Sequence, residues 1–448
     1  MTRISRALLE MAVVVLCVFT LTGVGLSQDA QYELRVEIPA SFNPVGSGAR
    51  ALGMGGAFIA VADDATSASW NPGGLIQLEL PEVSAVGALV HRVEENDFGR
   101  HPEADGAETV DITELNYFSA AYPFTLRGYN MIVSLNYQHL YDLTRQWSFP
   151  LAESSADGYL RQNVEYRQEG GLSALGLAYC VQITPALSAG LTLNIWDDDL
   201  TPNDWEQTTW QWGRGRDFGD DFVFTSRLHE RYSLSGINAN LGVLWRVGGG
   251  LTLGAVIKTP FDADVTHEQS LSTSIRYANP LIPESVGSSG RTEDATLTMP
   301  LSVGIGAAWR LSDRLSLSLD LYRTEWGDFE YVGSDGRAIS PINGAPAGSA
   351  GIDSTHQVRA GAEYLVIRPK YVVPIRSGLF YDPAPAPGSP DEFYGYSLGT
   401  GIGYDRYIFD IAYQARFGSG VGGAGLEELG LSQDISEHTL YASLIFHF

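Results

Sequence analysis

Two short motifs in the sequence match patterns of catalytic sites but lack the context that the chemistry requires. Gly395–Gly399 reads GYSLG and matches the G-x-S-x-G pattern of a nucleophilic serine. Such a serine needs a sharp turn between a strand and a helix, whereas Ser397 falls in the middle of a predicted strand. Gly418–Gly423 reads GSGVGG and matches a dinucleotide-binding pattern, but no predicted helix follows it. We therefore expect no catalytic residue and no enzyme activity.

Residue types that bind metals are present, but not at the usual spacing. The eight histidines form no H-x-x-x-H pair of the type that binds zinc on a helix. Asp197–Asp199 could bind calcium together with Asp220 and Asp221, although the spacing is not that of an EF-hand loop. We predict no bound metal and no cofactor.

An aromatic segment gives the strongest indication of a binding surface. The residues from 197 to 221 read DDDLTPNDWEQTTWQWGRGRDFGDD, and their large aromatic side chains are Trp205, Trp210, Trp212 and Phe218. Exposed apolar patches mark binding surfaces, so we interpret residues 198–220 as an outer loop that captures a hydrophobic ligand. The alternative is that these side chains pack the loop onto itself or anchor it at a membrane interface.

The elements that would position these residues alternate between apolar and polar side chains. In residues 314–326, Leu315, Leu317 and Leu319 share one face, and Ser316, Ser318 and Asp320 share the other. This period of two predicts strands with two unlike faces. The predicted strands are 82–93, 113–124, 129–145, 161–181, 187–197, 221–247, 250–269, 293–310, 314–329, 354–367, 372–382, 394–405, 407–416 and 436–448.

The connections between these strands are alternately short and long. A soluble sandwich has no reason to keep all its short turns at one end, whereas a transmembrane barrel has short periplasmic turns and long outer loops. The last eleven residues, HTLYASLIFHF, alternate and end in phenylalanine, which resembles the assembly signal of outer-membrane barrels. We therefore predict an all-β protein: a transmembrane antiparallel β-barrel of about 14 strands, residues 81–448.

The composition and the start of the chain indicate export. Arg3 and Arg6 precede an apolar run that ends near Ser27, which is typical of a signal peptide at residues 1–27. The formal net charge of −25 argues against nucleic acid as a partner. We expect a monomer surrounded by lipid in the outer membrane of a Gram-negative-type bacterium.

Residues 28–80 lack the alternation and precede the barrel. A barrel of this size has a lumen too wide for one layer of side chains to fill, so we predict that this segment is a hatch that plugs the lumen. Its glycines would allow close backbone approach, and the proline would end a short helix after the preceding asparagine. The hatch residues that we single out are Gly53, Gly55, Gly56, Asp63, Asp64, Asn71 and Pro72.

Charged residues fall on the polar faces of the predicted strands and would line the lumen. Unpaired charges away from water are costly, so we expect them to pair with one another or with the hatch. Alternatively, Arg359 or Arg376 could bind a ligand carboxylate, since a guanidinium suits bidentate contact. The predicted lumen network consists of Lys258, Asp320, Arg359, Glu363, Arg376 and Asp410.

The segment GARALGMGGAFIAVADDATSASWNPGGL, Gly48–Leu75, resembles the N-terminal hatch of the FadL-type outer-membrane family. Asn71-Pro72-Gly73 is similar to an Asn-Pro-Ala element of that family, with glycine in place of alanine, and residues 300–329 and 375–387 resemble its later strands. The family includes transporters of long-chain fatty acids and aromatic hydrocarbons.

The resemblance implies that outer loops capture an apolar small molecule, which then diffuses passively from the lumen into the membrane. Exit in that family is sideways through a gap at the third strand, for which residues 128–135 are our candidate. Relatives with the same hatch pattern serve secretion machinery, so docking or shuttling of secreted proteins is the alternative function.

Overall fold

We analysed a computed structural model of the chain. It describes residues 46–154, 158–217, 219–423, 426 and 429–448. The predicted signal peptide and residues 28–45 of the predicted hatch lie outside these ranges. In the described part of the chain, no helix has both the length and the apolar character needed to cross a membrane.

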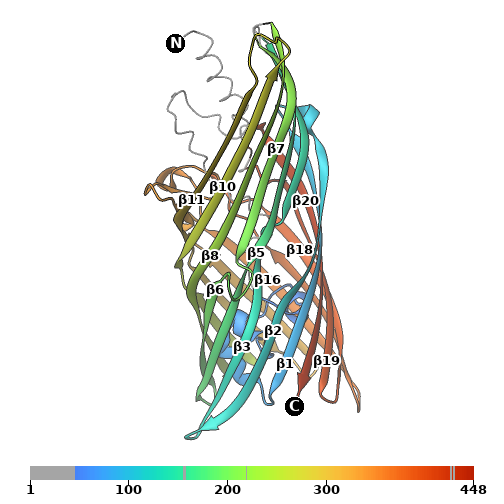
Figure 1. Ribbon diagram of the computed structural model, residues 1–448. Coiled ribbons are helices and arrows are strands. Elements are labelled where there is room, and N and C mark those ends of the chain that lie inside the picture. The colour runs from blue at the N-terminus through green and yellow to red at the C-terminus, as the bar shows by residue number, and fades with distance from the viewer. Residues whose placement is uncertain (1–45, 155–157, 218, 424–425, 427–428) are drawn as a thin grey trace.

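A closed ring of antiparallel strands forms the wall of the molecule (Figure 1). The ring closes because the first strand, β1 (Glu82–Phe98), pairs along its length with the last, β20 (Leu431–His447). Fourteen strands of the described chain make up this ring, as predicted. Those between β1 and β20 are β2 (Gly106–Leu126), β3 (Tyr129–Asp142), β5 (Gly158–Thr184), β6 (Leu187–Asp197), β8 (Asp220–Gly248), β9 (Leu251–Lys258), β12 (Ser302–Arg310), β13 (Leu315–Thr324), β16 (Thr355–Ile367), β17 (Val372–Tyr381), β18 (Phe393–Tyr404) and β19 (Tyr407–Val421).

Further strands extend the wall beyond one rim, partly where we had expected loops and partly within the predicted strands 250–269 and 293–310. They are β4 (Arg145–Ser154), β7 (Asp204–Asp217), β10 (Phe261–Tyr277) and β11 (Ser285–Met299). β7 lies between β5 and β8, and β10 lies between β8 and β11. We call this extension, which includes the upper parts of β5 and β8, the upper sheet (Figure 1). Short elements near it are β14 (Glu330–Val332), β15 (Ala338–Ile339), η2 (Pro102–Ala104), η3 (Trp326–Asp328) and η4 (Ala347–Ser349).

Two prolines separate the ring from the upper sheet. Pro260 lies between β9 and β10, and Pro300 lies between β11 and β12. Proline has no N–H to donate to a ladder, so it interrupts a strand. We had therefore wrongly predicted single strands at 250–269 and 293–310. The predicted loop at 198–220 was also wrong, because β7 occupies most of it.

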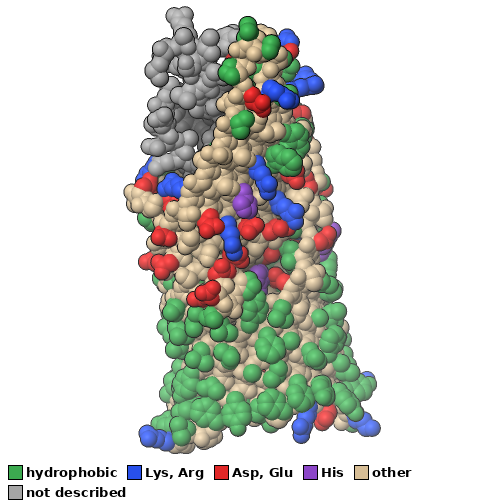
Figure 2. All heavy atoms as spheres, in the orientation of Figure 1, with side chains coloured by type: hydrophobic (Ala, Val, Ile, Leu, Met, Phe, Trp, Pro, Cys, Tyr) green, Lys and Arg blue, Asp and Glu red, His purple; other side chains and the backbone are tan. Residues whose placement is uncertain are grey.

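The ring is apolar outside and polar inside, the reverse of a water-soluble protein. On β13, Leu317 and Leu319 are 40% and 49% exposed, whereas the intervening Ser318 and the following Asp320 are buried. Figure 2 shows the resulting belt of hydrophobic side chains around the lower half of the molecule, with charged side chains above it and at the lower rim. Such a belt fits a bilayer, in which a lipid-facing charge is destabilising.

Residues 46–80 occupy the lower lumen and contain α2 (Ala49–Gly53), α3 (Ser67–Trp70) and η1 (Pro72–Gln77) (Figure 1). Helix α3 ends at Asn71, whose backbone is extended (φ −154°), directly before Pro72. The residue before a proline avoids the helical region, so the helix ends where we expected. At the other end of this helix, the Asp64 carboxylate accepts a hydrogen bond from the Thr66 backbone N–H, with an N···O distance of 2.9 Å.

Candidate functional site

Glycines on both sides let the backbone of the hatch touch the backbone of the wall. Gly55 has φ +69°, and a Cβ there would lie 3.1 Å from the Ala360 carbonyl oxygen. A Cβ on the facing Gly378 of β17 would lie only 2.2 Å from the Gly55 nitrogen. Larger side chains on either side would therefore push the hatch away from the wall.

Asn71 connects the hatch to the wall through its side-chain amide. Its Nδ2 donates to the carbonyl oxygens of Ile59 (2.8 Å) and Val243 (3.0 Å), and its Oδ1 accepts from the Gly73 N–H (3.0 Å). Val243 belongs to β8, so the contact with the wall is to strand backbone. Asn71 is completely buried, and each of these bonds satisfies a buried polar group that would otherwise be costly.

A chain of ion pairs, buried at Arg376 and partly exposed at Arg50, joins the hatch to three strands. Arg376 of β17 contacts Glu363 of β16 at 2.6 Å and Asp410 of β19 at 2.5 Å. Glu363 also pairs with Arg50 of α2 at 2.9 Å, and Arg50 pairs with Asp63 at 2.6 Å. The structure thus brings together three of the six predicted lumen residues with two hatch residues.

Two further lumen residues bind the hatch backbone. One carboxylate oxygen of Asp320 accepts hydrogen bonds from the N–H groups of Phe58 (2.6 Å) and Ile59 (2.8 Å). Arg359 donates to the Gly55 carbonyl (3.1 Å) and pairs with Asp382 at 3.1 Å. Arg359 and Arg376 are thus both engaged by the protein itself.

Asp64 is buried at the hatch–wall boundary beside Glu82, the first residue of β1. The backbone N–H of Ala65 donates to the Glu82 carboxylate at 3.0 Å, which holds this second carboxylate close to Asp64. Burial, with the negative charge of Glu82, raises the pKa of Asp64 to about 7. Protonation of this residue is therefore linked to packing of the hatch.

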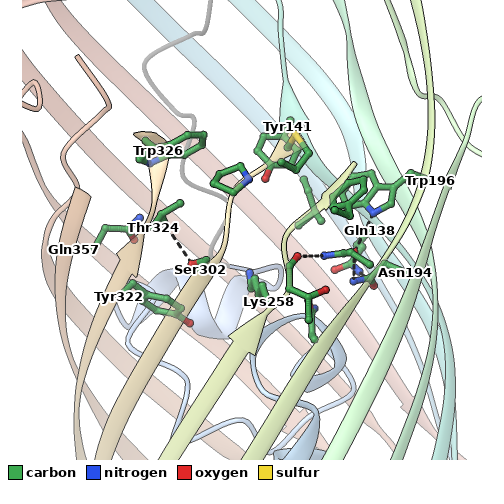
Figure 3. A pocket seen from close by; sticks show the side chains of 17 residues that line it. Gln138, Tyr141, Asn194, Trp196, Lys258, Ser302, Tyr322, Thr324, Trp326 and Gln357 are labelled. Carbon is green, nitrogen blue, oxygen red and sulfur yellow. Dashed lines mark hydrogen bonds between the residues drawn. The ribbon is translucent and has the colours of Figure 1, made fainter. Parts of the chain in front are cut away.

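An aromatic cavity lies above the hatch. Figure 3 shows the rings of Tyr141, Trp196 and Trp326 toward the upper sheet, with Lys258 and Tyr322 on the side of the hatch. Trp196 stacks on Phe261, with ring centroids 5.7 Å apart. This combination of apolar walls with a few polar groups is typical of small-molecule sites.

A second, more polar cavity of about 960 Å³ adjoins the aromatic cavity at Leu140. Its lining includes Gly46, Leu52, Gly56 and Trp70 of the hatch. Charged side chains from β1, β2, β3, β16, β19 and β20 complete it, among them Arg92, Glu114, His139, Asp142, Arg359 and Arg416. Together the two cavities occupy the lumen between the hatch and the upper sheet.

The polar cavity adjoins a split in the wall between β2 and β3. The ladder between these strands runs from Leu126–Tyr129 to Tyr117–Gln138. Toward the upper sheet, the described residues of β2 pair with β1, and those of β3 pair with β5, but no further β2–β3 pair follows. The first residues beyond the ladder are Asn116 and His139. The side-chain amide of Asn116 donates a hydrogen bond to the backbone carbonyl oxygen of His139 at 3.3 Å.

Our candidate for a wall gap, residues 128–135, was wrong. Residues 129–135 are paired with β2, and residues 131–135 are paired with β5 as well. The split begins at His139, eight residues after Met131, which is the first residue of β3 paired on both sides.

Solved structures with this architecture include a FadL homologue, a toluene transporter and a hydrocarbon channel. A FadL homologue of Pseudomonas aeruginosa matches with a TM-score of 0.58 at 14% identity, covering 91% of this chain and 100% of that one. The Pseudomonas putida toluene transporter TodX matches with 0.54 at 14% identity, covering 91% and 100%. The monoaromatic hydrocarbon channel CymD matches with 0.51 at 16% identity, covering 91% and 99%.

The fold is that of the FadL-type channels. At this level of identity the likeness concerns the fold and not the cargo. No family model matches the sequence, and no curated protein matches it.

Within this FadL-type fold, the predicted aromatic capture segment does not form one patch. Trp205 is buried and stacks on Tyr232, with ring centroids 4.7 Å apart. Trp210 and Trp212 lie on the face of β7 opposite to Trp205. Their ring centroids are 5.1 Å apart, and Trp210 is 47% exposed. Successive side chains of a strand point to opposite faces, which is why the tryptophans separate. Phe218 lies outside the described residues.

Sequence reasoning missed several residues of the lumen. Arg50, Asp382 and Arg416 take part in buried ion pairs, and Ser397 accepts a hydrogen bond from the Gly55 N–H at 2.8 Å. Arg50 could have been found from the sequence, because it belongs to the same predicted hatch as the acids Asp63 and Asp64. The partners of the others are far away in sequence, so no local pattern identifies them.

Proposed function

We propose that this protein is an outer-membrane channel for the passive uptake of hydrophobic small molecules, with long-chain fatty acids or hydrocarbons as cargo. The aromatic cavity above the hatch carries this proposal. It lies inside a barrel with an apolar belt, and its rings offer an apolar ligand a surface shielded from water. The solved structures of similar fold include transporters of toluene and other monoaromatic hydrocarbons.

The cargo follows a path from the aromatic cavity to the polar cavity and leaves through the split between β2 and β3. The straight route toward the lower rim is occupied by residues 46–80, which contact the wall through the Gly55 backbone and the Asn71 side chain. The two cavities meet at Leu140, next to the split. Lateral release into the membrane is therefore the route that residues 46–80 leave open.

Lys258 favours a cargo with an acidic head group. Its ammonium group lies on the hatch side of a cavity whose other walls carry Tyr141, Trp196 and Trp326. A carboxylate near Lys258 and an alkyl chain among the rings would satisfy both parts of the cavity. Fatty acids therefore fit the site better than plain hydrocarbons do.

Uptake assays test both the function and the head-group preference. Cells that lack their own fatty acid channel should take up a labelled long-chain fatty acid faster when they express this protein. Lys258→Met should reduce that uptake more than uptake of labelled toluene. Lys370→Met is the matched control, because Lys370 is exposed in the turn between β16 and β17. If expression accelerates neither compound, the channel function is wrong.

A reversible cross-link tests lateral release. Cysteines at Asn116 and His139, in a Cys180→Ser background, would join β2 to β3 at the first position beyond the ladder. The oxidised protein should lose uptake and the reduced protein should regain it. A cross-link within the existing ladder, between positions 119 and 136, is the control and should have no effect. Equal uptake by oxidised and reduced protein would place the exit elsewhere.

A further inference from the structure

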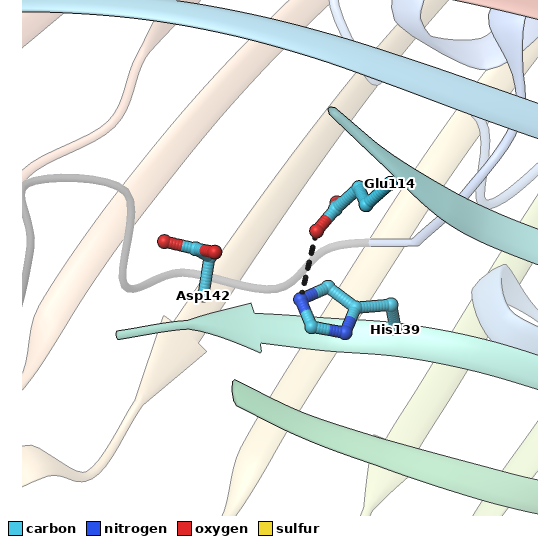
Figure 4. A group of neighbouring side chains, drawn as sticks. All are labelled: Glu114, His139 and Asp142. Atoms are coloured by element: carbon cyan, nitrogen blue, oxygen red, sulfur yellow. Dashed lines mark ion pairs between the residues drawn. The ribbon is translucent and has the colours of Figure 1, made fainter. Parts of the chain in front are cut away.

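We propose that Glu114, His139 and Asp142 form a binding site for a divalent transition-metal ion of the zinc type. One ligand atom from each residue lies within 4.8 Å of the others. His139 Nε2 and a carboxylate oxygen of Glu114 are 3.0 Å apart. Figure 4 shows Glu114 reaching from β2 toward the imidazole on β3, with Asp142 on the same strand pointing into the same space.

The imidazole is oriented for metal binding. Its Nδ1 lies 2.9 Å from the Ser173 hydroxyl, while its Nε2 is buried and lies 3.0 Å from a carboxylate oxygen of Glu114. In the tautomer whose Nδ1–H donates to Ser173, the Nε2 lone pair faces the Glu114 carboxylate, and a cation between the two atoms would be bound by both. Metal-binding histidines are usually held in this way by a partner on the other ring nitrogen.

Asp142 is held in a comparable manner. Its two carboxylate oxygens accept hydrogen bonds from the backbone N–H (2.9 Å) and the hydroxyl (3.2 Å) of Thr144. Carboxylates with fixed orientation lose less freedom when they bind an ion. Thr144 therefore supports Asp142 as Ser173 supports the imidazole.

The charges around the site leave room for a cation. Two carboxylates and an imidazole meet in a part-buried place on the lining of the polar cavity. The nearby cation Arg92 is engaged by Glu94 at 2.9 Å and lies 3.8 Å from Glu437. Arg92 is thus engaged elsewhere, and a divalent ion would balance the two negative charges of Glu114 and Asp142.

The donor set selects the class of metal. An imidazole nitrogen disfavours magnesium and calcium, which take oxygen ligands, whereas zinc and its neighbours bind imidazole and carboxylate together. Three protein ligands leave a coordination position for water, and the cavity lies on that side. Because one ligand belongs to β2 and two belong to β3, the ion would connect these strands beyond the end of their ladder.

Metal titration of the purified full-length protein tests the site. After treatment with a chelator, the detergent-solubilised protein should bind about one equivalent of Zn²⁺ by calorimetry. Co²⁺ should give a visible absorption band that Zn²⁺ abolishes. His139→Gln, Glu114→Gln and Asp142→Asn should each weaken binding at least tenfold, and Ser173→Ala should weaken it by about tenfold, as loss of a supporting hydrogen bond does.

His267→Gln is the matched control. His267 also contacts two carboxylates, Glu230 at 3.1 Å and Glu293 at 3.3 Å, but through different ring nitrogens, so no single nitrogen faces both. This variant should keep the wild-type affinity. A heat-modifiability gel establishes that each barrel is folded. Wild-type affinity in folded His139→Gln, or the same loss in His267→Gln, would overturn the proposal.

Discussion

The lower and upper halves of the lumen are built on opposite principles. In the lower half, the backbone of the hatch contacts the backbone of the wall, and charged side chains form ion pairs such as Arg376–Glu363. Above, two cavities remain, and aromatic and charged side chains face them. Residues 46–80 occupy only the lower lumen, so the barrel is closed at that level and open above it.

The largest expected effect comes from removing the lower half of this arrangement. Deletion of residues 28–77 should leave a water-filled lumen, because the ring of strands is closed by β1 and β20 without the hatch. In planar bilayers the deletion variant should conduct ions, whereas the full-length protein should conduct almost none. A folded deletion variant with no added conductance would show that something other than the hatch closes the lumen.

The next largest effect should come from breaking the buried charge network. Arg376→Met leaves the carboxylates of Glu363 and Asp410 without their shared partner, and a broken buried pair costs about 3–5 kcal/mol. We expect faster amide hydrogen exchange in α2 and leak current through the barrel. Arg310→Met is the control, because Arg310 forms an exposed pair with Asp313 at 3.7 Å, and such pairs contribute about 0–1 kcal/mol. Equal exchange in both variants would mean that the network does not hold the hatch.

A smaller effect is expected at the amide that joins the hatch to β8. Asn71→Ala removes three hydrogen bonds and leaves the Val243 and Ile59 carbonyls buried, at a cost of about 1–3 kcal/mol for each unsatisfied group. Uptake of a labelled hydrophobic compound should change, while heat-modifiable migration of the barrel stays normal. Asn130→Ala, at the exposed start of β3, should leave both unchanged. Normal uptake by folded Asn71→Ala would exclude a gating role.

The smallest effect should be a pH dependence of hatch packing. In the packed hatch the pKa of Asp64 is about 7, against about 3.9 for an aspartate in water. A raised carboxyl pKa means that packing is strongest below pH 4 and weakens as the pH rises through 7. The protection factors for hydrogen exchange of residues 64–77, which correct for the intrinsic effect of pH on exchange, should therefore be lower at pH 8.5 than at pH 6. Asp64→Asn should lose this dependence, and persistence of the full dependence would assign it to another group.

Sequence alternation determined the barrel and the two faces of its strands. The pattern at Leu317, Ser318 and Leu319 depends only on the period of two of an extended chain, so it can be read without knowing any partner strand. Asn71-Pro72 likewise ended the helix through local backbone chemistry. The upper sheet was missed because its polar strands, such as β7, lack an apolar face and look like loops.

Only the tertiary structure decided which residues meet in the lumen. Arg50 and Glu363 are 313 positions apart, and their pairing depends on the hatch being inserted at one height in a closed ring. Glu114 and His139 approach each other because β2 and β3 share a register that then splits. A shift of that register by one residue would turn one of the two side chains to the other face. Alternation specifies faces, whereas register and ring closure specify partners, and those arise only when the whole chain is folded.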